Sequence, residues 1–153
     1  MSCIQNTIAP VRVVYAKAGT LPAACVIRDT SFVIDHKLYW SSSASEQEAG
    51  YLASIFNSET ARSRTENLQS RGQWGARDFD KVIFNLPIPR FNPKDKTHAA
   101  LAKAAAAAEK IAVAFELPEG VKFQRARGLV RTALTEAGVA KRIDDLVAQL
   151  LDG

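Results

Sequence analysis

The sequence has few of the residues that build metal centres and disulfide frameworks, with two cysteines and two histidines among 153 residues. Cys3 and Cys25 are too few and too isolated for a disulfide framework or for the four ligands of a zinc site. Cys25 stands in the apolar run of residues 23–27, so we expect it to be a small core residue. These absences predict a chain with no metal site and no disulfide framework.

Sequence motifs of common catalytic and cofactor sites are also missing. The chain has no GxGxxG, no phosphate-binding loop, no HExxH and no Gly-x-Ser-x-Gly elbow. His36 lies beside Asp35 without a nucleophile nearby, and His98 lies at an expected helix start, so a structural or solvated role is favoured for each. We expect no catalytic residue, no cofactor and no enzyme activity.

Long apolar segments are absent too. No uninterrupted run reaches the roughly 20 residues of a membrane span. Residues 1–10 lack the basic start and apolar block of a signal peptide. These features predict a cytoplasmic protein without a membrane partner. With 47% hydrophobic residues, the chain can bury a core and is not expected to be disordered.

The positive charge of the chain is concentrated in one segment. Residues 61–97 carry eight Lys or Arg against four Asp or Glu, whereas residues 1–60 carry four against five and residues 98–153 carry eight against seven. The local excess has two interpretations, a footprint for phosphate groups or a solvated loop. Charge alone does not separate them.

The hydrophobic pattern changes along the chain. Three short runs, at residues 11–17, 23–28 and 32–40, predict a small, mostly antiparallel sheet, in which Tyr39 and Trp40 are expected in the core. Ser45 with Glu48 predicts the capped start of a helix. Further helices are expected from near His98, over 123–137 and over 139–151, the last two broken at Gly138. We therefore predict an α+β fold: an α+β domain over 1–92, then a helical spacer or docking region over 93–153.

The segment Gly72–Pro93 joins these two parts. It combines glycines, prolines, Trp74 and several cations, and each proline ring stiffens the backbone by fixing φ. Side chains that can donate to phosphate oxygens or to base edges cluster in and before it. The candidate DNA-contacting residues are Lys17, Arg62, Arg64, Arg71, Gln73, Arg77, Lys81 and Arg90.

The order of these features resembles a known family. A strand ends at Val14–Thr20, a second run covers Phe32–Trp40, a helix spans Ala49–Ser58, and the stretch Leu86–Asn92 leads into a long helix. This order is similar to the C-terminal target-recognition region of bacterial N6-adenine DNA methyltransferases of restriction–modification systems, including relatives of type I specificity subunits. The resemblance covers about residues 11–115, and Leu86–Asn92 is its most specific element.

The resemblance implies a DNA-binding specificity module without a catalytic domain. The α+β part would dock on double-stranded DNA, and the helical part would act as a spacer toward a catalytic methyltransferase or restriction subunit. Flipping and methylating the adenine would belong to that partner. Asn85 does not form a methylation motif, because no proline follows it directly and Ile88 separates Pro87 from Pro89.

Two other hypotheses stay open. The chain could be a protein-interaction module that uses its helical part without contacting DNA, with homo-oligomers formed through small-residue helix faces. A small enzyme that uses Asp35 and His36 is the weakest of the three hypotheses.

Overall fold

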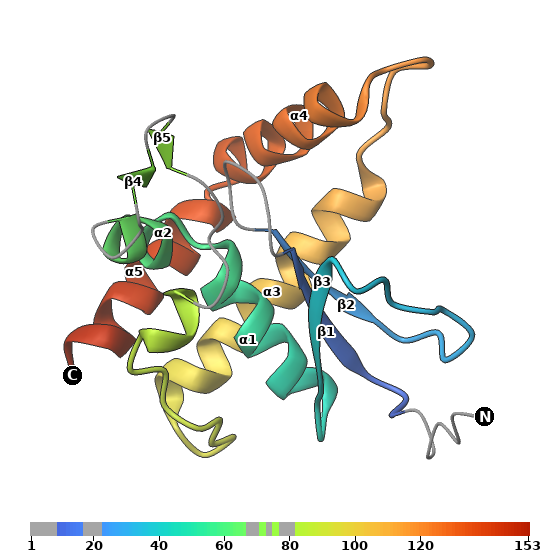
Figure 1. Cartoon of the computed structure of the whole chain (residues 1–153). Helices are drawn as coiled ribbons and strands as arrows, with labels where there is room; N and C mark the ends of the chain where they lie inside the picture. Colours follow the sequence, from blue (N-terminus) through green and yellow to red (C-terminus); the bar gives the residue numbers. More distant parts are fainter. Residues whose placement is uncertain (1–8, 17–22, 67–70, 73–74, 77–81) are drawn as a thin grey trace, which may run out of the picture.

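The structure is a computed structural model that describes residues 9–16, 23–66, 71–72, 75–76 and 82–153. A three-stranded antiparallel sheet is followed by five α-helices, so the predicted α+β class is confirmed (Figure 1). Strands β1 (Arg12–Ala16), β2 (Ala24–Ile27) and β3 (Leu38–Ser42) form the sheet in the order β2-β1-β3. The predicted antiparallel pairing of the first three apolar runs is therefore correct.

The register of the sheet decides which side chains enter the core. Val13 and Tyr15 are buried toward the helices, while Val14 points to the other face between Cys25 and Trp40. Cys25 is exposed and Trp40 is 56% exposed, so the expectation that both belong to the core is wrong. The physical reason is the two-residue period of a strand, which puts both opposite Val14 on the outer face.

The third strand is shorter than the sequence predicts. It begins at Leu38 instead of Phe32, and Phe32 and Val33 are 59% and 88% exposed. Asp35 makes the turn that replaces the expected strand: its side chain accepts from the Lys37 amide at 2.8 Å and its carbonyl accepts from the Leu38 amide. The preceding loop is held by the buried Arg12 guanidinium, which donates to the carbonyls of Asp29 and Phe32.

Helix α1 (Glu46–Asn57) lies between the sheet and the long helix α3 (Lys96–Ala114) (Figure 1). The predicted cap of α1 is confirmed, because the Ser45 hydroxyl accepts from the Glu48 amide. The alanine-rich face of α3 allows a close approach: a Cβ atom built on Gly50 would lie 3.2 Å from the Cβ of Ala105. The small side chains of α3 thus permit close helix packing.

Three more helices complete the fold: α2 (Glu59–Glu66), α4 (Phe123–Glu136) and α5 (Val139–Asp152). The break between α4 and α5 falls at Gly138, as predicted, and this glycine has a positive φ of 71°. The hydrophobic core runs across the boundary at residues 92 and 93 that divides the two predicted domains. Leu101, Ile143 and Val147 belong to the same cluster of buried residues as Val13 and Tyr51.

Candidate nucleic-acid interface

The basic segment of the sequence starts on α2 and continues into a small hairpin. Strand β4 (Arg71–Gly72) pairs antiparallel with β5 (Gly75–Ala76), and the 3₁₀ helix η1 (Val82–Asn85) follows. Figure 1 shows this hairpin beside α2 and apart from the three-stranded sheet. The most cationic part of the chain therefore includes a short two-stranded ribbon outside the main sheet.

The two candidate arginines of α2 are both paired with carboxylates of the same chain. Arg62 donates to Glu59 through Nε at 2.9 Å and forms a second ion pair with Glu66 at 2.6 Å. The hydrogen bonds to Glu59 raise the pKa of Arg62. These carboxylates orient the guanidinium, and any phosphate group would have to share it with them.

Arg64 contacts the C-terminal helix α5. Its Nη2 donates to Asp152 at 2.6 Å and its Nη1 donates to the Leu151 carbonyl at 3.4 Å. A second link joins the same two helices, because Asp144 of α5 accepts from the amides of Glu59 and Thr60 at the start of α2. Arg64 thus helps to fasten α2 to α5, a structural role that the sequence analysis did not foresee.

Helix α4 contributes arginines that the sequence analysis missed. Arg127 and Arg131 are four residues apart, so they share one face of the helix. Burial lowers the pKa of Arg131 most, the charges of Arg127 and Arg62 lower it further, and Glu59 acts in the opposite direction. We refer to Arg62, Arg127 and Arg131 as the arginine cluster. The arginine spacing in residues 125–131 indicates the α4 half of this cluster, but not its proximity to Arg62.

Arg127 is held against an aromatic ring. Its Cζ atom lies 5.6 Å from the ring centroid of Phe123, which is 73% exposed. This distance is within the range of cation–π attraction. Its Nη2 atom is buried and has no hydrogen-bond partner among the residues that the structure describes. A buried guanidinium N–H in this state is a strong donor for an anion.

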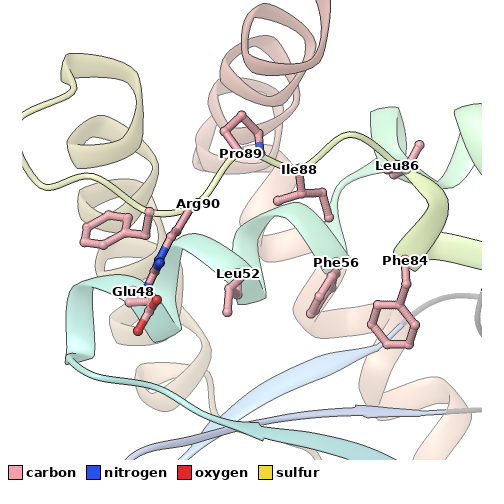
Figure 2. A pocket seen from close by; sticks show the side chains of 9 residues that line it. Glu48, Leu52, Phe56, Phe84, Leu86, Ile88, Pro89 and Arg90 are labelled. Carbon is pink, nitrogen blue, oxygen red and sulfur yellow. The ribbon is translucent and has the colours of Figure 1, made fainter.

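Arg90, the last candidate of the basic segment, lies at a groove on α1 (Figure 2). The groove has a volume of about 340 Å³ and is bordered mainly by apolar side chains of α1 and of residues 84–91. Figure 2 shows Arg90 extending toward Glu48, near the start of α1, whereas α2 follows the end of α1. A helix of this length spans about 18 Å. The structure therefore does not bring Arg90 next to Arg62 or Arg64.

The remaining candidates have no described side chains. Arg71 lies in β4 and only its backbone is described. Lys17, Gln73, Arg77 and Lys81 lie outside the described residues, as does Trp74. Their predicted contacts with DNA stay predictions.

The two histidines occupy different environments. His98 is buried, its Nδ1 accepts from the Asn92 amide at 3.0 Å, and its ring stacks on Phe91. His36 is exposed in the turn before β3, 3.4 Å from the Asp35 carboxylate. His98 thus has the structural role that the sequence favours.

No protein-family model, no curated protein and no solved structure matches this chain. Within the described part of the chain, no helix is both long and apolar enough to cross a membrane. The same residues contain no group of three or more His, Cys, Asp or Glu that could hold a metal ion.

Proposed function

We propose that this protein is a DNA-binding target-recognition module of the kind found in adenine methyltransferases of restriction–modification systems. The observation that carries the proposal is the fold of the basic segment. The residues with the largest excess of positive charge lead from α2 into a two-stranded hairpin outside the main sheet.

This arrangement has a physical counterpart in DNA recognition. The major groove of B-form DNA is wide enough for one helix or for a two-stranded ribbon. Arg71 lies on the hairpin, and Gln73 and Arg77 adjoin it in the sequence. Arginine can bond guanine and glutamine can bond adenine through two hydrogen bonds each. The hairpin is therefore proposed to read the bases, while neighbouring helices contact the backbone.

Catalysis is assigned to a partner. A methyltransferase or restriction subunit would bind the cofactor and flip the target adenine, and this chain would supply sequence recognition.

Binding to duplex DNA as a function of salt tests the proposal. Fluorescence anisotropy with a duplex of about 20 base pairs should give an affinity that falls steeply as NaCl rises, because bound phosphates release counterions. Arg71→Ala and Arg77→Ala should each weaken binding without changing the melting temperature. Undetectable binding at low salt, or binding that does not respond to salt, would contradict the proposal.

A second candidate function is protein interaction without DNA contact. Three exposed apolar side chains, Val113, Leu117 and Phe123, lie at or near the connection between α3 and α4 and favour it. Light scattering distinguishes the two: a chain that self-associates and has no DNA affinity would support this alternative.

A further inference from the structure

The two edges of the three-stranded sheet differ in whether their backbone groups are bonded. At the β2 edge, Oδ1 of Asn57 accepts from the Ala24 amide at 3.0 Å and Nδ2 of Asn57 donates to the Ala24 carbonyl at 2.9 Å, as a neighbouring strand would. Arg28, directly after β2, pairs with Glu46 of α1 and Glu109 of α3. The β2 edge is therefore tied to the helices at both ends and is not open to another strand.

The β3 edge has no such cover. The Ser43 amide donates to the Val11 carbonyl of the same sheet at 3.0 Å, and the alternation of an antiparallel ladder then turns the amide and the carbonyl of Trp40 away from β1. No hydrogen bond joins these two groups to any residue in the part of the chain that the structure describes. The Trp40 side chain is more than half exposed, so this edge is accessible from outside.

The sequence of β3 lacks the features that keep an edge strand from pairing. Its five residues, Leu-Tyr-Trp-Ser-Ser, include no charged residue, no proline and no glycine, and its register with β1 continues without a bulge. Natural proteins place lysine, proline or a bulge on edges that must stay unpaired. The β3 edge is thus suited to pairing with another strand.

A second copy of the same edge is a self-complementary partner. In an antiparallel pair with a two-fold axis at Trp40, each Trp40 bonds its counterpart, and each Ser42 amide donates to the Leu38 carbonyl of the other copy. The Leu38 amide is not required, because it already donates to the Asp35 carbonyl of its own chain. Since the other edge of the sheet is closed, the pairing ends with two copies and does not continue into a fibre.

The distribution of charge favours this antiparallel arrangement. Lys37 directly precedes β3, whereas α1, with Glu46 and Glu48 in its first turn, begins shortly after β3 ends. Antiparallel pairing places the start of one strand beside the end of the other, so the cation of each copy lies toward the acidic end of its counterpart. Parallel pairing would instead bring the two Lys37 side chains together, which is unfavourable.

We propose that this protein forms a two-fold symmetric dimer, in which β3 pairs antiparallel with β3 of a second copy. The sheet of three strands then continues into that of the other copy. The two Trp40 side chains lie side by side on the outer face and bury apolar surface against each other. The dimer forms without DNA, so it goes beyond the proposed function, and it uses a sheet edge where the sequence suggested helix faces.

Amide hydrogen exchange at two protein concentrations tests the pairing directly. The Trp40 and Ser42 amides are bonded across the interface of the dimer, so they should exchange about tenfold more slowly at about 200 μM protein than at about 2 μM. The Tyr39 and Ser41 amides face β1 within one chain and serve as the internal control. Their exchange should depend much less on protein concentration.

Two substitutions block the edge without removing a hydrogen bond within the sheet. Ser42→Pro removes the outward amide, and Trp40→Lys replaces the apolar contact with a positive charge at the two-fold axis. Sedimentation velocity at about 200 μM should give the mass of two chains for the wild type and of one chain for either variant. Circular dichroism checks the fold of both, and Trp40→Lys carries the test if Ser42→Pro unfolds.

The matched control is Phe123→Lys, which makes the same kind of change at an exposed aromatic residue of α4 and should leave the dimer intact. A wild type that stays monomeric, with Trp40 and Ser42 amides that exchange equally fast at both concentrations, overturns the dimer. A dimer that persists in both edge variants, or that dissociates only in Phe123→Lys, overturns the β3 interface and assigns association to another surface. DNA affinity enters none of these results, so the proposed function stands or falls separately.

Discussion

The arginines of α2 and those of α4 carry the same charge but differ in what surrounds them. Arg62 and Arg64 are bound to carboxylates of α2 and α5. Arg127 rests on a phenyl ring with one donor atom buried and unsatisfied within the described residues. Arg131 is half-buried, and this burial together with the charges of Arg127 and Arg62 lowers its pKa. A count of cations therefore does not locate an anion site, because an arginine that pairs with a carboxylate of the same chain is less available to an added anion.

The largest expected effect comes from removing Arg127. Arg127→Gln should lose about tenfold in duplex affinity and about 1 in salt slope, since a donor without a hydrogen-bond partner among the described residues disappears. Anisotropy titrations at several salt concentrations measure both quantities. In Arg64→Gln the affinity should change by less than about twofold, because its guanidinium already bonds Asp152 and the Leu151 carbonyl. A larger loss in Arg64→Gln than in Arg127→Gln would reverse the comparison.

The next effect concerns the attachment of α2. Asp144→Ala removes the acceptor for the amides of Glu59 and Thr60 and should lower the free energy of unfolding by about 1 kcal/mol, as for a lost helix cap. Urea unfolding followed by circular dichroism measures the loss. Asp144→Asn keeps one acceptor oxygen and should retain most of the stability. Equal stability of Asp144→Ala and the wild type would mean that this cap does not hold α2 in place.

The smallest expected effect comes from Glu59 and tests whether carboxylates lower the affinity of the arginine cluster for DNA. Glu59→Gln removes the acidic partner that Arg62 and Arg131 share, so duplex affinity should rise by about two- to threefold at low salt. Glu136→Gln removes the same charge from the last residue of α4 and serves as the control. An unchanged affinity in Glu59→Gln would show that the ion pairs of α2 do not lower the affinity of the arginine cluster for DNA.

The same residue gives the protein a predictable response to acid. Hydrogen bonds from Arg62 hold the pKa of Glu59 below its usual value of 4.5. Folding therefore favours the carboxylate form, and this stabilisation is present above pH 4.5 and is lost as the pH falls through the lowered pKa of the folded protein. Urea unfolding at about pH 6 and about pH 3 should show a smaller acid-induced loss in Glu59→Gln than in the wild type.

Local signals in the sequence were enough to predict the helices with clear ends. Ser45 and Gly138 each mark a helix boundary, and each does so through its own side chain or backbone. Such features depend on a few neighbouring residues, so a linear reading captures them.

Features that depend on register or on distant partners could not be predicted in the same way. The exposure of Cys25 and Trp40 follows from pairing with Val14, and the strand expected from Phe32 fails because of the turn at Asp35. Helix α2 has few apolar residues and is stabilised by Asp144, far along the chain. The arginine cluster needs α2 and α4 together, so neither half reveals it alone.

The hydrogen bond between Asp144 and the Glu59 amide spans 85 residues, and this separation predicts the order in which parts of the fold form. Closing so long a loop costs more entropy than forming local contacts, so α2 gains its cap only after α5 has docked. During synthesis, the start of the basic segment would leave the ribosome well before the residue that fixes it. The nascent chain would then have its core helices in place before the start of α2 is capped. In pulsed hydrogen exchange during refolding, the amides of Glu59 and Thr60 should become protected later than those of α1 and α3.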